Sequence, residues 1–400
     1  MKKTIGILFP ASSKGGVYQY ALSIVDSLLS YCSDYEYVVF HEGGRPDPSS
    51  NCGAANCQFV QISNRGITAV GKVLHLLGLQ SSLNSLLVKN IAEAVKTSPV
   101  DLLIIPTPIF FDYPLGIPFI VTNPDYMDKY FPEFDEYALR TKIARDIVFR
   151  RYGKDALLVI TDAPQGIEDL NKFSGVDKAK IRIIPYIPPG YIYRLRDMDL
   201  KTADDILSKY GLPEKYFFYP AQFWYQKNHF RLIKAVHLAR EKYKTEINLI
   251  LVGNSKGSRI YESVCKEVSC LIESLGLKKQ IIHLGYTTEE ETVALYRRSS
   301  GLIAPPFQGP TTIPPLEAMI LGVPVATINM FDVPKQVGDA GLLFDPYSVE
   351  DMAEKMFNLW SDANLRKKMI EKGFKQTKGM TQEDYASKWK AAIEKALFSC

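Results

Sequence analysis

The chain has 400 residues, of which 46% are apolar and 23% are charged, and its formal net charge is +4 at pH 7. This length exceeds one ordinary hydrophobic core and fits two domains, and the composition excludes a collagen-like or wholly disordered chain. So small a net charge gives no support to a nucleic-acid-binding function.

The first predicted elements are a strand at residues 4–9, TIGILF, and a helix at residues 17–31, where apolar residues recur at helical spacing. The turn between them contains Gly15 and Gly16, which let a backbone approach a ligand closely and leave N–H groups free at the helix start. The turn lacks both GxGxxG spacing and a GKS or GKT ending, so it predicts neither a dinucleotide site nor a P-loop.

The same N-terminal stretch bears on cellular location. Its apolar run is too short for the core of a signal peptide, which favours a first strand. No run of about 18 apolar residues occurs in the chain, so we expect no membrane-spanning helix. The cysteines lack the close CxxC spacing of a zinc site and suit reduced thiols. We therefore expect a cytoplasmic protein.

Strands and helices alternate in both halves of the chain. The first half continues with strands at 35–40, 101–106, 118–123 and 156–161 and with helical patterns at 81–97 and 135–151. The second half has strands at 215–222, 247–253, 281–286, 301–306 and 324–329, and helical patterns at 229–243, 258–275, 289–299 and 314–321. This βαβ alternation predicts parallel sheets covered on both faces.

A stretch rich in proline, residues 185–200, interrupts the periodicity and is the predicted linker. We therefore predict an α/β protein with two doubly wound, Rossmann-like domains, residues 1–190 and 191–380, and a C-terminal helix at 381–400 that packs back toward the first domain. Ligands of such sheets bind beyond the carboxyl ends of the strands, so we expect the site in the cleft between the domains.

Two segments of the second half indicate an anion site. Lys227 and Asn228 follow a strand and an aromatic loop and precede a helix, a position that suits a diphosphate clamp. The segment GPTTIPPLEAM, 309–319, begins a helix, whose N-terminus attracts anions, and Thr311 and Thr312 add hydroxyl groups. Glu317 suits paired hydroxyl groups such as those of a ribose. The alternatives are a solvated lysine and a capping threonine with a solvated glutamate.

The segments at 12–17, 219–229 and 301–356, in this order, resemble those of the family 4 glycosyltransferases, which have the GT-B fold, and the resemblance covers nearly the whole chain. The most specific match is residues 301–356, which contain PPLEAM, GVPV and GDAGLLFDP. The resemblance implies retaining transfer from a nucleotide-sugar donor without a metal. It also implies a glycan or lipid-linked acceptor, since GPTT is similar to a GPTN variant of surface-polysaccharide transferases.

The resemblance also assigns roles to residues of this chain. It implies that Glu317, as the second Glu of the EX7E motif, holds the donor ribose, that Lys227 contacts the diphosphate and that Tyr286 contacts the base. The remaining donor-binding residues that it implies are Gly15, Gly16, Gln222, Asn228, Gly253, Gly309, Pro310, Thr311, Thr312 and Ile313.

Three positions depart from the family pattern. Gly309 replaces the first Glu of EX7E, Gln222 replaces an arginine and Pro124 replaces a histidine. Asp125, beside the last of these, remains a candidate that faces the sugar or the acceptor, and with Lys227 and Glu317 it completes the set of predicted catalytic residues. A nucleotide-sugar epimerase of similar fold and a non-catalytic sugar-nucleotide-binding subunit are the alternatives, which the product and the presence of turnover distinguish.

The helical segment 138–154 is basic and amphipathic. Its cations are Arg140, Lys142, Arg145, Arg150, Arg151 and Lys154. Such a surface attracts an anionic membrane, so we expect peripheral contact at the inner face of the membrane through this segment. The alternative is an ordinary solvated face of the helix.

Overall fold

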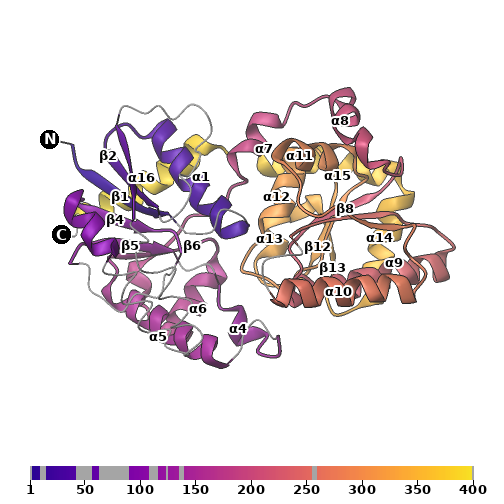
Figure 1. The fold of residues 1–400 in the computed structure, drawn as a ribbon, viewed down its shortest axis with the longest axis horizontal. Helices are drawn as coiled ribbons and strands as arrows, with labels where there is room; N and C mark the ends of the chain where they lie inside the picture. Colours follow the sequence, from indigo (N-terminus) through magenta and orange to yellow (C-terminus); the bar gives the residue numbers. More distant parts are fainter. Residues whose placement is uncertain are drawn as a thin grey trace. The chain divides into compact units, whose positions relative to one another are not determined.

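The computed structural model describes residues 2–9, 15–41, 56–62, 90–107, 116–122, 125–134, 139–254 and 259–398. The chain forms two compact units (Figure 1). The first unit contains Met1–Tyr126, Leu139–Gly190 and Met380–Cys400, and the second contains Met127–Ala138 and Tyr191–Gly379. Each unit is built on one parallel sheet.

The first sheet has the order β3-β2-β1-β4-β5-β6-β7 among the described residues, and all its paired strands are parallel. Strands β4 and β6 are buried along their whole length, because apolar, β-branched runs can pack on both faces of a parallel sheet. The strands are β1 (Thr4–Phe9), β2 (Glu36–His41), β3 (Cys57–Gln61), β4 (Leu102–Ile105), β5 (Phe119–Thr122), β6 (Leu158–Thr161) and β7 (Ile181–Ile183).

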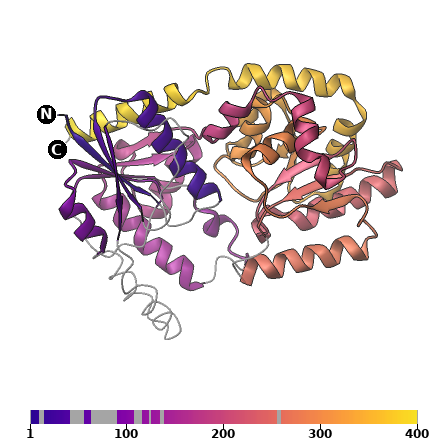
Figure 2. The ribbon, with the colours of Figure 1, turned by 45° about the horizontal axis from the view of Figure 1, so that its top comes forward.

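Helices cover both faces of this sheet (Figures 1 and 2). On one face α1 (Gly16–Tyr31) packs along its length on α16 (Gln382–Phe398), and both helices contact the strands. On the other face α5 (Leu139–Asp155) packs on α6 (Pro164–Ser174). Residues 90–97 are helical as predicted, whereas residues 81–89 lie outside the described part of the chain.

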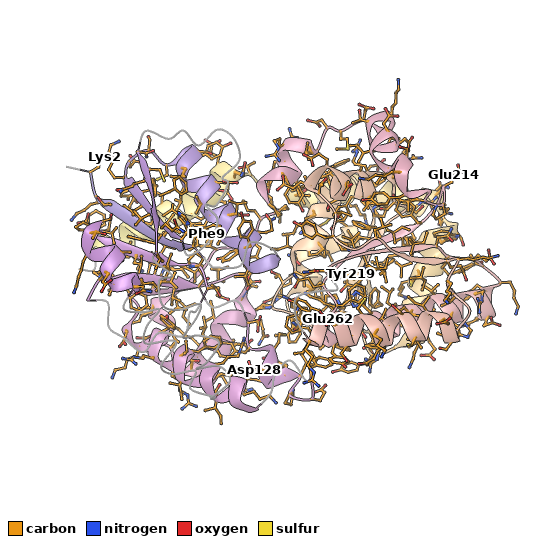
Figure 3. The ribbon with its side chains drawn as sticks, viewed as in Figure 1. Lys2, Phe9, Asp128, Glu214, Tyr219 and Glu262 are labelled. Carbon is orange, nitrogen blue, oxygen red and sulfur yellow. The ribbon has the colours of Figure 1, made fainter. Side chains whose placement is uncertain are left out.

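The second sheet has the order β10-β9-β8-β11-β12-β13 in the described ranges, again with every pair parallel. Figure 3 marks Tyr219, a fully buried side chain of its central strand β8. The strands are β8 (Phe217–Pro220), β9 (Leu249–Val252), β10 (Ile281–His283), β11 (Leu302–Ala304), β12 (Val325–Ile328) and β13 (Gly341–Phe344).

The helices of the second unit form two layers over its sheet (Figure 1). One layer contains α8 (Leu200–Leu207), α11 (Glu289–Arg298), α12 (Ile313–Ile320) and α15 (Ala363–Thr377). The other contains α9 (His229–Tyr243), α10 (Arg259–Ser274) and α14 (Val349–Ser361). Shorter helices are α4 (Met127–Tyr130), α7 (Gly190–Leu195) and α13 (Val333–Val337).

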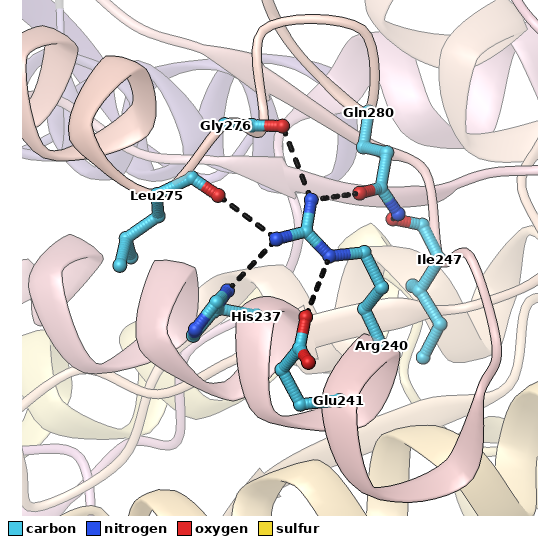
Figure 4. Close-up of polar contacts among 7 residues, drawn as sticks. All are labelled: His237, Arg240, Glu241, Ile247, Leu275, Gly276 and Gln280. Carbon is cyan, nitrogen blue, oxygen red and sulfur yellow. Dashed lines mark hydrogen bonds and ion pairs between the residues drawn. The ribbon is translucent and has the colours of Figure 1, made fainter.

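Arg240, near the end of α9, fastens that helix to the end of α10 (Figure 4). Its guanidinium group donates to the carbonyl oxygens of Leu275 at 3.0 Å and Gly276 at 3.1 Å. These carbonyls follow the last residue of α10, where they lack partners within the helix. A cation at this position satisfies them and also interacts favourably with the negative end of the helix dipole.

The structure confirms the predicted pair of parallel, doubly wound sheets and corrects some elements. Strands β3, β7 and β13 were not predicted, because each is short and partly exposed and therefore lacks a long apolar run. The segment predicted as a linker, residues 185–200, contains the short helix α7. Within the described ranges, no helix has both the length and the apolar character needed to cross a bilayer.

Candidate functional site

The strand order places a topological switch point between β8 and β11 in the second unit. From these neighbouring strands the chain continues toward opposite edges of the sheet. It runs from β8 to β9 toward one edge, and from β11 to β12 toward the other. Open α/β sheets bind ligands at such a point, beyond the carboxyl ends of the strands. The loops at 221–228 and 305–312 follow these two strand ends, and they hold most of the predicted site residues.

Lys227 ends a short 3₁₀ turn, Tyr225–Lys227, after β8. Its Nζ donates a hydrogen bond to Oε1 of Gln308, in the loop after β11. Its backbone carbonyl accepts from the Tyr219 hydroxyl at 2.9 Å, which holds the turn against the strand. Burial lowers the pKa of nearby His229 to about 3, so this imidazole is neutral at pH 7 and the positive charge beside it belongs to Lys227.

Asn228 joins the ends of two strands. It is buried and has a left-handed backbone, with φ of 59°, a conformation that asparagine tolerates better than most residues. Its Nδ2 donates to the carbonyls of Pro305 at 3.0 Å and Pro346 at 2.9 Å, which follow β11 and β13. Since both amide hydrogens are used within the protein, Asn228 positions the Lys227 turn.

Gln222 and Gly253 lie at the ends of β8 and β9. The Oε1 of Gln222 accepts from Trp224 Nε1 and from the Tyr261 hydroxyl, both at 3.2 Å, which leaves its Nε2 group without a partner among the described residues. A Cβ on Gly253 would lie 2.2 Å from the carbonyl oxygen of Ala221. Glycine at 253 therefore permits the close approach of the two strand ends.

The start of α12 is held by Gln336. The N–H of Thr312 donates to Gln336 Oε1 at 3.1 Å, and Gln336 Nε2 donates back to the Thr312 carbonyl at 2.8 Å. Pro314 and Pro315 carry no N–H group. This helix start therefore offers an anion fewer backbone donors than an ordinary helix N-terminus does.

Two donors remain at the start of α12. The Thr312 hydroxyl is buried, with its residue 5% exposed, and has no hydrogen-bond partner among the described residues. The N–H of Ile313 makes no hydrogen bond in the same part of the chain. An unpaired buried hydroxyl is costly, so a ligand oxygen that meets Thr312 would remove that cost.

Gly309 lies against an aromatic ring. A Cβ at this position would come within 2.6 Å of Phe331 Cδ2 and 3.0 Å of Phe331 Cβ. Phe331 has a φ of 56° and packs with Tyr130 and Phe131 in an aromatic cluster of the second unit. The ring occupies the space that a glutamate at 309 would need, which gives a physical reason for the departure from the EX7E pattern.

Glu317 is the buried carboxyl of the site. It lies on α12, is 7% exposed, and its Oε2 accepts a hydrogen bond of 2.7 Å from the Tyr296 hydroxyl on α11. Burial raises the pKa of Glu317 to about 7 against a smaller opposite effect of the Tyr296 hydrogen bond. Glu317 is therefore not a solvated surface glutamate, and its carboxyl changes charge near neutral pH.

The other predicted residues lie apart from these loops. Tyr286 follows β10 and its side chain is 59% exposed. In the first unit, Gly15 precedes α1 with a φ of 98°, and a Cβ on Gly16 would meet nothing within 4 Å. Residues 12–14 of the Gly-rich turn, and Pro124, lie outside the described residues.

Asp125 also belongs to the first unit. Its Oδ1 and its backbone carbonyl both accept from Nη2 of Arg145, at 3.0 and 3.1 Å. The ion pair attaches the segment after β5 to helix α5, where Arg145 lies. Arg145 was predicted as part of a membrane-facing cluster. In the structure, part of its guanidinium group is instead occupied by Asp125.

The sequence patterns did not identify the partners of the site residues. Tyr296, Gln308, Gln336 and Phe331 contact Glu317, Lys227, Thr312 and Gly309, respectively. In the sequence, Tyr296 fits the apolar pattern of an amphipathic helix, and Gln336 resembles an ordinary exposed polar residue. Neither carries a local signal, because their contacts depend on packing between distant segments.

Part of the chain matches a known protein family. Residues 204–376 match the family described as Glycosyl transferases group 1. The O-antigen chain mannosyltransferase B of Escherichia coli is 29% identical over 181 residues, which are 45% of this chain and 46% of that protein. The chain thus spans about half the length of this curated relative, and about a fifth of the serotype-specific mannosyltransferases of Escherichia coli that it also matches.

Solved structures match over nearly the whole chain. WaaG, a glycosyltransferase involved in lipopolysaccharide biosynthesis, has a TM-score of 0.70 at 18% identity, and the match covers 98% of this chain and 99% of that one. Anabaena Alr3699/HepE in complex with UDP-glucose has a TM-score of 0.74 at 14% identity, with coverage of 98% and 99%. At these identities the likeness shows the fold, which is GT-B.

Proposed function

We propose that this chain, whose residues 204–376 form a Glycosyl transferases group 1 domain on a GT-B fold, moves a sugar from a nucleotide-sugar donor to a glycan or lipid-linked glycan. The observation that supports this most is the set of groups around the β8 and β11 ends. These are the Lys227 ammonium, the Thr312 hydroxyl, for which the described ranges supply no partner, and the buried Glu317 carboxyl. A cation, hydroxyl and backbone donors, and a carboxylate together suit diphosphate and ribose.

Each group has a distinct role in this proposal. Lys227, the Thr312 hydroxyl and the Ile313 N–H stabilise the negative charge that develops on the departing diphosphate. Glu317 accepts hydrogen bonds from the ribose hydroxyls, which favour its charged form. The exposed ring of Tyr286 stacks on the base. These donors belong to the protein itself, so we propose that the transfer proceeds without a metal ion.

The reaction that we propose retains the configuration of the sugar. The acceptor hydroxyl attacks the anomeric carbon on the face of the leaving group, and its proton passes to an oxygen of the departing β-phosphate. The bond between the anomeric carbon and the diphosphate oxygen breaks, and the nucleoside diphosphate leaves. No protein nucleophile takes part, so the mechanism requires positioning and charge stabilisation only.

The names of the relatives guide the choice of substrate. Since the Escherichia coli relatives named above are mannosyltransferases by name, a mannosyl donor is the first to test, in a role in bacterial surface-polysaccharide synthesis. Because Alr3699/HepE was solved with UDP-glucose, a glucosyl donor is the second. A thermal-shift screen against UDP, GDP and dTDP and their sugars should show a rise in Tm with one nucleotide, since a ligand of the native state stabilises it.

Product analysis then separates the alternatives. NMR of the first-formed product should show the anomeric configuration of the donor, and an inverted centre would refute the retaining mechanism. An isomerised nucleotide-sugar would identify an epimerase. Binding without turnover, with all candidate acceptors, would identify a non-catalytic subunit.

We propose in addition that α5 contacts an anionic membrane, at its inner face in the cell. Ile143 and Ile147 lie one helical turn apart and are 53% and 60% exposed, and the exposed cations Arg150 and Lys154 follow on the same helix. Vesicle sedimentation should show binding to anionic lipids that falls in an Ile147→Glu variant. Equal binding to neutral vesicles, or no effect of the variant, would contradict this contact.

A further inference from the structure

A second pocket lies at the start of α9, beside the Lys227 turn. It has a volume of about 340 Å³, within the range of small-molecule sites. Phe134, Tyr225, Asn228, Phe230, Arg231, Lys234 and Val349 line it. None of the predicted donor-binding residues except Asn228 takes part in its wall.

Two cations of this pocket have no carboxylate partner among the described residues. Arg231 and Lys234 lie one turn apart on α9, and neither forms an ion pair within the described residues. In the same part of the chain, the guanidinium of Arg231 makes one hydrogen bond, a long one of 3.4 Å to Asn228 Oδ1. Since a guanidinium carries five N–H donors, most of them remain available to a ligand.

The guanidinium of Arg231 is held in place by aromatic rings. Its Cζ lies 5.3 Å from the centroid of Phe307 and 5.6 Å from that of Tyr347, and these rings contact each other at 4.7 Å. Cation–π contacts restrict the side chain without consuming its N–H groups. Glu133 and Asp345 act electrostatically on Tyr347, yet neither forms an ion pair with Arg231. Arg231 is therefore preorganised to bind an oxyanion.

The pocket also has an apolar wall. Tyr225 and Phe230 stack with an interplanar angle of 11° and a centroid distance of 6.0 Å, and Phe134 lines the pocket beside them. Flat aromatic faces pack well on the C–H face of a sugar ring, while a free phosphate ion would gain nothing from them. The combination of an oriented guanidinium, a second cation and aromatic faces points to a ligand that is both anionic and cyclic.

We propose that this pocket binds an anionic saccharide, whose phosphate or carboxylate group meets Arg231 and Lys234 and whose ring packs against the aromatic wall. The site is separate from the proposed donor site and does not depend on it. The two adjoin through the neighbouring residues Lys227 and Asn228, and through Gln308 and Phe307. A charged acceptor glycan or a free sugar phosphate would supply the same chemistry.

Isothermal titration of the full chain with glucose 6-phosphate tests the site. Arg231→Gln should weaken binding by about tenfold or more. Lys242→Gln, which makes the same charge change on the same helix outside the pocket, should leave it unchanged. The weaker binding of Arg231→Gln and the unchanged binding of Lys242→Gln should both persist when Lys227→Ala is also present. This result would separate the site from the donor site.

Two further probes define the ligand. Glucose and inorganic phosphate should each bind more weakly than glucose 6-phosphate, because each satisfies only one part of the pocket. Equal affinity for inorganic phosphate would overturn the saccharide assignment, and an equal loss in the Arg231→Gln and Lys242→Gln variants would overturn the site itself. An elongation assay with charged and neutral acceptor glycans, in which Arg231→Gln affects only the charged one, would identify the acceptor as the source.

Discussion

At the scale of single residues, folding and ribose binding favour opposite charge states of the Glu317 carboxyl group. Burial raises its pKa from 4.5 to about 7, so the fold favours the protonated form. Its contribution to stability is therefore complete below pH 4.5 and is lost as the pH rises through 7. A ribose, by contrast, prefers the charged carboxylate.

Glu317→Gln should therefore stabilise the protein and weaken its donor binding. The amide still accepts the Tyr296 hydrogen bond and carries no charge, so urea unfolding at pH 8 should show a gain on the order of 3 kcal/mol that shrinks toward pH 5. Calorimetry should show weaker nucleotide binding at pH 8. Glu290→Gln, at an exposed position of α11, is the control for both measurements. An unchanged Kd would contradict the ribose role.

Lys227 supplies the charge beside the neutral His229. Lys227→Ala should lower kcat/KM by about 10²-fold, the size of effect seen when one stabilising donor is removed from an active site, while the circular dichroism spectrum stays unchanged. Lys279→Ala, at an exposed position of the same unit, is the matched control. Turnover near the normal value at both low and saturating donor would exclude the diphosphate role.

At the scale of elements, the loop after β11 is shaped by contact with the Phe331 ring. Gly309→Ala places a methyl group 2.6 Å from the ring and 3.0 Å from Phe331 Cβ, so rotation of the ring alone does not relieve the contact. We expect a loss of about 1–3 kcal/mol in the free energy of unfolding. Gly16→Ala, which enters open space, should change it by less than about 0.5 kcal/mol. If the two variants lose the same stability, the Phe331 contact is not the cause.

The junction of α9 and α10 depends on Arg240. Arg240→Ala removes the partners of the Leu275 and Gly276 carbonyls and should cost about 1–2 kcal/mol in urea unfolding. The junction takes no part in the proposed site, so KM for the donor should not change. Lys242→Ala, on the same helix, is the control, and an equal loss in that variant would assign the effect to the charge of the helix end.

Individual elements show which parts of the fold could be predicted from the sequence. The helix at 229–243 was predicted with the bounds that α9 has, because its apolar residues repeat over four turns. The edge strand β3, CQFVQ, gave no such signal, since an edge strand need not bury either face fully. At the candidate site, the motif residues were named from the sequence because they are contiguous. Their partners Tyr296 and Phe331 were not, because only tertiary packing brings them close.

At the scale of the whole molecule, the charge at the proposed donor site is supplied by the protein. Since Lys227 and the start of α12 can neutralise a diphosphate, the initial rate should persist in excess EDTA. Added Mg²⁺ should not restore the Lys227→Ala variant. A rate that collapses in EDTA and returns with Mg²⁺ would show that the transfer needs a metal.

The C-terminal helix has a further consequence for how the protein is made. In the first unit α1 packs along α16, although residues 16–31 and 382–398 are separated by all of Tyr191–Gly379, which forms most of the second unit. The first unit is thus begun first on the ribosome and completed last. We expect its buried surface on α1 to remain open until residue 398 has emerged, so that nascent chains stalled earlier bind chaperones and are cleaved by protease.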